Sequence, residues 1–367
     1  MLFLLSVLSF KNSLISVLSF KKSIMSLLSF KKSTPMKFLV ISFFLVALLL
    51  TIVPHVAYLI ARAVGSVTDT HVRYRPFAIA NIIAVTLWAL VIAYGYYFGR
   101  FRHEVRQVEM EFDNLPPAFD GIRLVHISDI HLDSWTGHEA VLDTIVSHIN
   151  SLHPDIICFT GDLVSIKAEE LQRFRHILTR LHTRPGGYGI FSILGNHDYM
   201  PYAYKDNPRQ RSADRRQLVA FEQDTLGWHL LMNHRAVLRR GDDHITVIGC
   251  ENQSVGFHSV IRRGNLRKAM GDNPGTFSIL LTHDPTQWRK EVVGKTAIPL
   301  TLAGHTHAMQ FRVCGITPVK LVYPECDGIY TEGNQRLYVN IGLGGTMPWR
   351  VGATPEITLI TLRRKNP

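Results

Sequence analysis

Five short motifs rich in aspartate, asparagine and histidine each directly follow an apolar run. They are Asp129-Ile130-His131, Gly161-Asp162, Gly195-Asn196-His197-Asp198, a lone His283 and Gly304-His305-Thr306-His307. Carboxylate and imidazole ligands together suit Mn, Fe, Zn, Co or Ni. The carboxylates are too few for an oxygen-only calcium cage, and no CxxC pair offers a structural zinc site. The motifs therefore predict a centre for divalent transition metals.

The apolar runs before the motifs predict strands that bring the motifs to one edge. Strands are expected at 122–128, 155–160, 189–194, 245–249, 277–282, 299–303, 337–340 and 356–362, and helices at 137–152 and 168–181. Ligand sites in open α/β sheets lie beyond the carboxyl ends of strands. Strands alternating with helices, followed by strand-rich sequence, predict an α/β sandwich with two central sheets.

Residue spacing within the motifs predicts how the side chains point. In an extended chain, residues two apart project from the same face, which would align Asp129 with His131 and His305 with His307. A glycine stands directly before Asp162 and before other motif residues, and glycine permits a sharp exit from a strand.

The motif order DxH, GD, GNHD, H and GHxH resembles the calcineurin-like metallophosphoesterase family over roughly residues 120–362. The segment LYVNIGLG at 337–344 and the later Pro355-Glu356-Ile357 resemble the membrane-linked branch of that family. The resemblance implies a four-layer α-β-β-α sandwich and hydrolysis of a phosphodiester or pyrophosphate bond by a hydroxide held between two divalent metal ions.

The family pattern also implies a role for each motif residue. One metal would be bound by Asp129, His131 and His307, and the other by Asn196, His283 and His305, with Asp162 bridging both. His197 would contact the phosphate or protonate the leaving oxygen, and Asp198 would orient a histidine.

Three further residues near the motifs have alternative interpretations. His126 is expected to be a strand residue near the site, and His138 is expected to open a helix. Arg350, beside a tryptophan in the loop after the glycine-rich turn, either contacts substrate phosphate or is structural, and the structural role is favoured.

Two uncharged runs of 23 residues, at 38–60 and 77–99, predict membrane-spanning helices. The second ends in tyrosines, a phenylalanine and arginines, which is typical of an interfacial belt. Both ends of such a hairpin lie on one side of the membrane. Basic residues flanking the runs slightly favour a cytoplasmic catalytic domain at a bacterial inner membrane.

Formal charge separates the first 110 residues from the rest. Residues 1–110 hold 12 Lys/Arg and 3 Asp/Glu, whereas residues 111–367 hold 28 and 26. The basic balance therefore belongs beside anionic lipid, and a nucleic-acid partner is disfavoured. The charge and hydropathy patterns predict a membrane anchor at 36–106 and a metallophosphoesterase domain at 107–367.

Residues 1–35 carry a ten-residue repeat, with SLISVLSFKK at 13–22 followed by SIMSLLSFKK at 23–32. This period matches neither a helix nor a strand. The segment is expected to be low-complexity sequence preceding the natural start at Met36, or else a membrane-surface segment.

Cys158, Cys250, Cys314 and Cys326 are expected to be reduced core residues, which favours a reducing compartment.

The membrane anchor makes a lipid-linked phosphate an attractive substrate, and relatives in the family cleave UDP-2,3-diacylglucosamine. The alternatives are a general phosphodiesterase or phosphatase acting on soluble substrates, and an inactive membrane scaffold. The scaffold is disfavoured because no ligand position is missing. The sequence does not indicate an oligomeric state.

Overall fold

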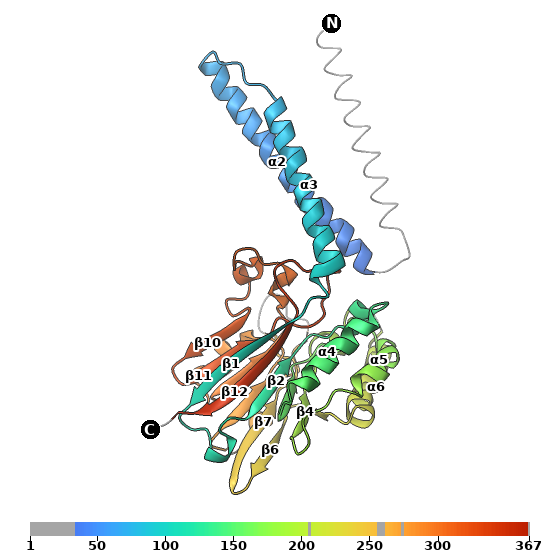
Figure 1. The fold of residues 1–367 in the computed structure, drawn as a ribbon, viewed down its shortest axis with the longest axis vertical. Helices are drawn as coiled ribbons and strands as arrows, with labels where there is room; N and C mark the ends of the chain where they lie inside the picture. The colour runs from blue at the N-terminus through green and yellow to red at the C-terminus, as the bar shows by residue number, and fades with distance from the viewer. Residues whose placement is uncertain (1–33, 205–206, 255–260, 273–274, 366–367) are drawn as a thin grey trace. The chain divides into compact units, whose positions relative to one another are not determined.

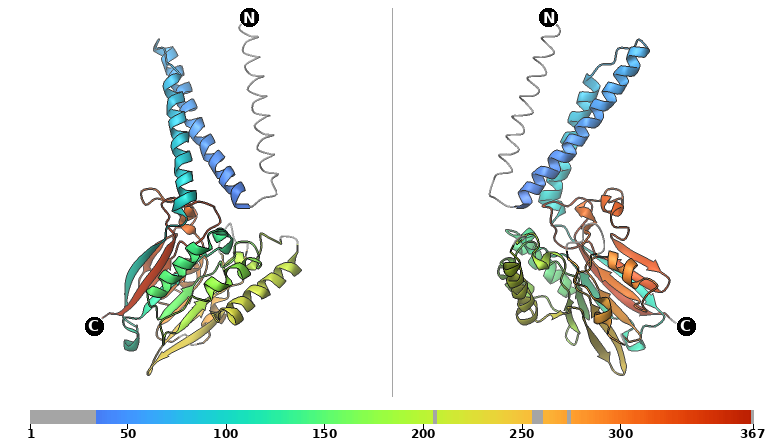
Figure 2. Two further views of the ribbon diagram at one scale, coloured as in Figure 1. Left: turned by 45° about the vertical axis from the view of Figure 1, so that its right-hand side comes forward. Right: turned by 180° about the vertical axis from the view of Figure 1, so that it is seen from behind.

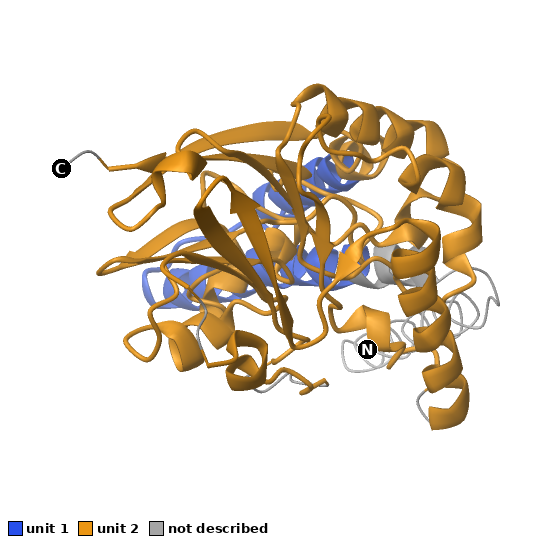
Figure 3. Cartoon of the chain, turned by 90° about the horizontal axis from the view of Figure 1, so that it is seen from below, with its two compact units in different colours: residues 1–92 blue, residues 93–367 orange. Residues whose placement is uncertain are grey.

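The computed structural model describes residues 34–204, 207–254, 261–272 and 275–365, and the ten-residue repeat lies outside them. The chain divides into two compact units, Met1–Ile92 and Ala93–Pro367 (Figure 3).

The described part of the first unit consists of apolar helices. α2 spans Thr34–Val67, and α3 spans Arg75–Tyr94 and continues into a π-helical turn at Gly95–Gly99. Stretches of 25 residues in each, Phe43–Val67 and Arg75–Gly99, are long and apolar enough to cross a membrane. The two predicted helices are therefore present. α2 extends beyond its predicted bounds at both ends, whereas the second helix begins two residues earlier than predicted and its π-helical turn ends at the predicted residue.

The second unit contains two six-stranded sheets (Figure 1). The first has the order β1-β12-β2-β3-β4-β5. Its strands are β1 (Glu104–Phe112), β2 (Arg123–Ile127), β3 (Ile156–Phe159), β4 (Gly189–Ser192), β5 (His229–Leu230) and β12 (Glu356–Arg364). β2 to β5 run parallel, whereas β12 is antiparallel to β2 and parallel to β1.

The second sheet has the order β10-β11-β9-β8-β7-β6. Its strands are β6 (His234–Arg240), β7 (Asp243–Gly249), β8 (Ser278–Leu281), β9 (Leu300–Ala303), β10 (Gly328–Glu332) and β11 (Gln335–Val339). β7, β8, β9 and β11 run parallel, and β6 and β10 form the antiparallel edges.

Successive side chains along a strand point to opposite faces of the sheet, so apolar side chains lie on both faces of each sheet. Leu124 and Ile156 of the first sheet pack against Ile245, Ile279 and Leu302 of the second, which forms the core between the sheets.

The outer face of the first sheet is covered by α4 (Glu139–Ser151), α5 (Glu170–Leu178) and α6 (Pro208–Ala220) (Figure 2). The outer face of the second sheet is covered by α7 (Leu266–Met270) and the π-helical turn Trp288–Val292. These four layers confirm the predicted α-β-β-α sandwich.

The strands missing from the sequence prediction are short or lie at sheet edges. β1, β6 and β10 are edge strands with mostly exposed or half-buried residues, and β5 has only two residues. Three of the four cysteines are buried as expected, but Cys314 is exposed in a tight turn, so the prediction was wrong for that residue.

Removing a side chain from the core between the sheets should destabilise the second unit. Leu281 is fully buried there. Because Leu→Ala in a core costs about 2–5 kcal/mol, Leu281→Ala should lower the Tm by roughly 5–15 °C. The measurement is thermal unfolding of the detergent-solubilised protein by circular dichroism. The matched control is Leu321→Ala, since Leu321 is 91% exposed. An equal Tm for both variants would contradict the assignment of this core.

Candidate metal centre

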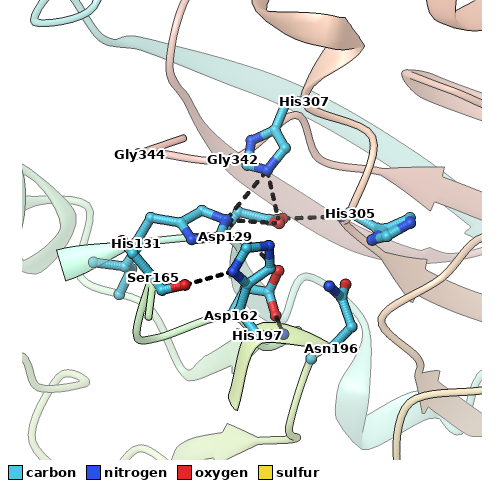
Figure 4. Close-up of polar contacts among 12 residues, drawn as sticks. Asp129, His131, Asp162, Ser165, Asn196, His197, His305, His307, Gly342 and Gly344 are labelled. Atoms are coloured by element: carbon cyan, nitrogen blue, oxygen red, sulfur yellow. Dashed lines mark hydrogen bonds and ion pairs between the residues drawn. The ribbon is translucent and has the colours of Figure 1, made fainter. Parts of the chain in front are cut away.

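The motif residues lie in loops and short 3-10 turns after the carboxyl ends of parallel strands, and Figure 4 shows those that it labels. Asp129 and His131 follow β2, Asp162 follows β3, and Asn196 and His197 follow β4. From the second sheet, His283 follows β8, and His305 and His307 follow β9. The structure therefore brings the predicted residues of both sheets to one place.

The first group of side chains contains Asp129, His131 and His307. The Nε2 atoms of the two histidines lie 3.3 Å apart. Asp129 Oδ1 lies 3.3 Å from His307 Nε2 and 3.8 Å from His131 Nε2. Their ligand atoms are close enough together to hold one metal ion.

The second group contains Asn196, His283 and His305. His283 Nε2 lies 3.1 Å from Asn196 Oδ1 and 3.2 Å from His305 Nδ1. The backbone carbonyl of Thr160 lies 2.7 Å from His283 Nδ1, so it accepts the proton there and leaves Nε2 facing the group.

Asp162 lies between the two groups. Its Oδ2 is 3.6 Å from His131 Nε2 on one side and 3.2 Å from His283 Nε2 on the other. Its Oδ1 accepts a hydrogen bond of 2.8 Å from the backbone N–H of His197. A carboxylate in this place can reach a cation in either group.

The ligand-bearing loops are not extended, contrary to the prediction from residue spacing. Asp129, His131, Asp162, His305 and His307 all have positive φ, between 46° and 73°. Such angles are uncommon for residues other than glycine and cost of order 1–3 kcal/mol each. Convergence therefore comes from left-handed turns directly after the strands, and not from strand alternation.

Two motif glycines allow the loops to approach each other. A Cβ on Gly195 would collide with Asp162 Oδ1 and lie 2.7 Å from His283 Cε1. A Cβ on Gly304 would collide with Ser128 Oγ and lie 2.5 Å from Asp129 Oδ2. These glycines are required for close packing around the site.

Burial sets the electrostatics of the site. It lowers the pKa of His131 and His307 well below the ordinary value, with smaller effects of His197 on the first and Arg350 on the second. Burial also lowers the pKa of His305. Burial of His283 acts to lower its pKa, but Asp162, Asp129 and the Thr160 carbonyl together raise it to about 10. Burial of Asp162 acts to raise its pKa, but His283, His197 and His131 together hold it well below the usual range.

His197 is held beside both groups without belonging to either set of predicted ligands. Its Nδ1 donates to the backbone carbonyl of Ser165 at 2.6 Å, which leaves Nε2 available (Figure 4). Its ring packs between His131 and Tyr202, with centroid distances of 4.7 and 4.6 Å. His197, His131 and Asp162 also have ligand atoms close enough to hold a cation.

Among the described residues, the hydrogen bonds of Asp198 go to the backbone and none goes to a histidine, unlike the predicted role. Its carboxylate accepts hydrogen bonds of 2.7–3.2 Å from four backbone N–H groups, those of Asp162, Leu163, Val164 and Gly195. Burial and the Asp162 carboxylate raise its pKa to about 7, while the N–H donors oppose the rise. Asp198 therefore ties the Asp162 loop to the loop after β4.

Arg350 is structural and lies out of reach of solvent, with 2% exposure. Its guanidinium donates to the backbone carbonyls of Ala353, Ile341 and Gly344, and one nitrogen lies 3.4 Å from His307 Nδ1. Burial lowers the pKa of Arg350 to about 10. It therefore holds the glycine-rich loop against His307.

The expectations for the two other histidines are confirmed. His126 is a buried residue of β2 whose Nε2 lies 2.9 Å from Thr160 Oγ1. His138 immediately precedes α4.

Two tyrosines near the site were not found from the sequence. The Tyr323 hydroxyl lies 2.9 Å from His305 Nε2, and the Tyr202 hydroxyl accepts from Asn196 Nδ2 at 3.4 Å. Neither stands in a motif, and each follows a loop whose path the sequence does not specify.

The donor set fits divalent cations. Imidazole nitrogens, carboxylate oxygens and the Asn196 amide oxygen lie 3.1–3.8 Å from one another. These atoms bring together more lone pairs than the available N–H groups can satisfy by hydrogen bonding. Asp129 Oδ1 is buried and, among the described residues, has no hydrogen-bond partner. A buried oxygen of this kind is costly unless a cation or donor reaches it.

Comparison with known proteins gives a consistent result. The family model for calcineurin-like phosphoesterases matches residues 122–309. The uncharacterized metallophosphoesterase YkuE of Bacillus subtilis is 29% identical, over 77% of this chain and 95% of its own length. UDP-2,3-diacylglucosamine pyrophosphatase LpxG of Chlamydia trachomatis is also 29% identical, over 67% of this chain and 86% of its own length.

A Danio rerio transmembrane protein with a metallophosphoesterase domain is 28% identical, over 77% of this chain and 63% of its own length. Together with the two apolar helices, this likeness supports membrane association. Among solved structures, phosphopantetheinyl hydrolase of Mycobacterium tuberculosis matches with a TM-score of 0.35 and 14% identity, over 63% of this chain and 91% of that one.

The family match covers half of the chain and includes every strand end that carries a motif. The chain therefore belongs to the calcineurin-like phosphoesterase family and is a metal-dependent phosphoric ester hydrolase.

Proposed function

We propose that this chain is a membrane-anchored phosphoesterase that uses two divalent metal ions to hydrolyse a phosphodiester or pyrophosphate bond. The observation that carries the proposal is the position of Asp162, whose Oδ2 lies within 3.6 Å of a histidine in each ligand group. One carboxylate flanked by two sets of imidazoles is the arrangement that a pair of cations needs.

Each of the two ligand groups would hold one metal ion. Asp129, His131 and His307 would hold one ion, and Asn196, His283 and His305 the other, with Asp162 shared. Two such ions lower the pKa of a bound water and take up negative charge that develops on the phosphoryl oxygens. Their identity among Mn, Fe, Zn, Co and Ni is not distinguished by this donor set.

His197 is the proposed acid and phosphate contact. The Ser165 carbonyl fixes its Nδ1 proton, so Nε2 is the atom that faces a bound phosphate. A protonated Nε2 can donate to a phosphoryl oxygen and then to the departing oxygen. Asp198 acts indirectly, because it holds the backbone of the Asp162 loop.

A lipid-linked substrate is supported by exposed apolar side chains in the segment between His307 and Tyr323. Val313, Ile316, Leu321 and Val322 are all more than half exposed. They precede Tyr323, whose hydroxyl contacts His305. Exposed apolar groups gathered in one segment are typical of lipid or ligand contact. UDP-2,3-diacylglucosamine, the substrate in the printed name of LpxG, is therefore the first candidate, with soluble diesters as the alternative.

The proposed architecture is an anchor at 36–106 whose two helices cross the membrane, followed by a phosphoesterase domain at 107–367. Lys37 and three arginines after the second helix, at 100, 102 and 106, flank the outer ends of the hairpin. Arg73 lies in the connecting segment, Arg75 begins α3, and Arg62 lies near the end of α2. The outer ends thus carry slightly more basic residues than the side of the connecting segment, and this excess supports a cytoplasmic catalytic domain.

Asp162→Asn and His197→Ala should separate metal binding from proton transfer. Asp162→Asn removes the shared charge, so it should lose bound metal together with at least about 100-fold in activity. His197→Ala should retain about two ions per chain and still lose about 10²- to 10⁴-fold.

The measurements are elemental analysis of the purified anchored protein and hydrolysis of bis-p-nitrophenyl phosphate with added Mn²⁺. If activity survives in both variants, the proposed mechanism is wrong. If the wild type binds metal but hydrolyses neither diesters nor pyrophosphates, the scaffold alternative is favoured.

Replacing exposed apolar residues should affect lipid substrates selectively. The double variant Ile316→Ser/Leu321→Ser loses apolar contact area and should raise the KM for UDP-2,3-diacylglucosamine in mixed micelles by about tenfold or more. The kcat/KM for bis-p-nitrophenyl phosphate serves as the internal reference. Val237→Ser is the control, because Val237 is an apolar residue of the edge strand β6 that is 47% exposed. Equal losses on both substrates would argue against a lipid-contacting segment.

A further inference from the structure

Residues 95–101 form a junction between α3 and β1, and they belong to the second unit. The π-helical turn Gly95–Gly99 comes first, followed by Arg100 and Phe101. None of these residues belongs to the five motifs, and the proposed mechanism uses none of them. Their contacts nevertheless lead to two of the loops that carry predicted metal ligands.

The junction packs against the backbone at Arg350. The Arg350 N–H donates to the Gly95 carbonyl at 3.2 Å. A Cβ on Gly99 would collide with the Arg350 carbonyl oxygen, and a Cβ on Gly95 would lie 2.9 Å from the same atom. Any larger residue at these two places would push the turn and the Arg350 backbone apart. The junction therefore fixes where that backbone lies.

The side chain of Arg350 connects this contact with the first ligand group. Its guanidinium lies 3.4 Å from His307 Nδ1 and donates to the Gly344 carbonyl. The other ring nitrogen of His307, Nε2, lies 3.3 Å from Asp129 Oδ1. The Gly344 N–H in turn donates to the Asp129 carbonyl at 2.8 Å (Figure 4). Arg350 therefore supports two ligands of that group from behind.

A second connection runs through the backbone of the next residue, Val351. Its N–H donates to the Gln310 carbonyl at 2.9 Å, and its own carbonyl accepts from the Arg312 N–H at 2.8 Å. Gln310 ends the short helix that begins at His307. The backbone that follows His307 is thus hydrogen-bonded to the same loop that packs against the junction.

The junction also contacts the loop that holds Asp129 and His131. The Phe101 ring packs against Trp135, with a centroid distance of 6.4 Å. Trp135 is 2% exposed, and its Nε1 donates to the Ile130 carbonyl at 2.8 Å. Ile130 stands between the two ligands in the chain. Phe101 therefore supports that loop from the side of the junction.

The contacts of the junction favour one ligand group over the other. Among the hydrogen bonds and ring contacts of the described residues, none joins residues 95–101 to the loops after β4 and β8, which carry Asn196 and His283. The loop after β9 carries a ligand of each group, but the backbone that Val351 reaches follows His307. Residues that hold a ligand from behind set its orientation, and their replacement typically lowers metal affinity by about 10- to 100-fold.

We propose that residues 95–101 are positioning residues of the metal centre, required for full binding of the ion that Asp129, His131 and His307 would hold. The inference rests on the proposed two-metal function and adds a support for one of the two ions. The end of the predicted membrane helix α3 thus contributes to the construction of the site as well as to attachment.

The test compares Mn²⁺ binding by the wild type and Gly99→Ala, both full-length in detergent and stripped of metal beforehand. Alanine is normally more favourable than glycine in a helix, so a loss must come from the collision with the Arg350 carbonyl. Isothermal titration calorimetry should show about two ions per wild-type chain. In Gly99→Ala one ion should bind about 10- to 100-fold more weakly, while the affinity for the other is unchanged.

Ligand variants identify which ion is affected. In a His283→Ala background, the loss caused by Gly99→Ala should persist, because the first ligand group is still complete. In a His307→Ala background, Gly99→Ala should have little further effect, because the ligand that it positions is gone. Such non-additivity is the sign that two residues act on the same interaction.

Two further variants guard against misfolding and general effects. Phe101→Leu keeps an apolar side chain and loses the ring contact with Trp135, so it should weaken the same ion to a smaller degree. Tyr97→Ala is the matched control, because Tyr97 lies in the same turn and is 66% exposed. Its Mn²⁺ affinities should equal those of the wild type. Hydrolysis of bis-p-nitrophenyl phosphate by Gly99→Ala should recover when Mn²⁺ is raised about 100-fold, which a merely unfolded protein would not do.

Three results would overturn the proposal. One is an unchanged Mn²⁺ affinity in both Gly99→Ala and Phe101→Leu. Another is an equal weakening of both ions, and the third is a matching loss in Tyr97→Ala. Either of the last two would indicate a general effect of disturbing the end of α3.

The binding measurement needs no hydrolysis, so it separates this inference from the proposed function. If the wild type binds two ions but hydrolyses no ester, and Gly99→Ala still weakens one of them, the hydrolytic function fails and the positioning role stands. If hydrolysis occurs and neither ion depends on Gly99 or Phe101, the positioning role fails alone. A wild type that binds no ion overturns both.

Discussion

The buried carboxylate of Asp162 is the constraint on which the site depends. It lies between two sets of imidazoles, accepts the backbone N–H of His197, and has its own backbone N–H bound by Asp198. A charge buried this deeply is stable only when cations or donors surround it. The left-handed turns at five ligand positions and the close glycine contacts bring those partners within reach. Backbone strain at these turns is thus offset by the interactions that they make possible.

The sequence predicts the parts of this site that short stretches of neighbouring residues identify. The motifs follow buried strands, and the apolar runs of those strands are continuous because helices cover the sheets. The five motifs therefore identify the side chains that the structure brings together. The runs at 122–128 and 277–282, for example, correspond to β2 and β8. Edge strands such as β6 have mixed exposure and give no such pattern.

Interactions made through the backbone could not be predicted in the same way. Asp198 and Arg350 are both buried and both bind main-chain groups, Asp198 in a segment 35 residues earlier and Arg350 within its own loop, up to nine residues away. The identity of Leu163 does not indicate that its backbone N–H will donate to a buried carboxylate, and that of Ile341 does not indicate that its carbonyl will accept from a buried arginine. The positive φ at Asp129 and His131 is likewise imposed by the loops of β3 and β9 that pack against them, since an isolated Asp-x-His favours an extended conformation.

The pairing of β1 with β12 has a consequence for the order of folding during synthesis. β1 is hydrogen-bonded in the first sheet only to β12, over nine residues from Glu104↔Glu356 to Phe112↔Arg364. β12 also pairs with β2, the strand that leads into Asp129. On the ribosome, β1 emerges about 250 residues before its partner. The first sheet therefore stays in two pieces until β12 has been made, and β1 presents an unpaired edge throughout that time. The first sheet becomes continuous only when β12 is inserted between two strands that were made long before.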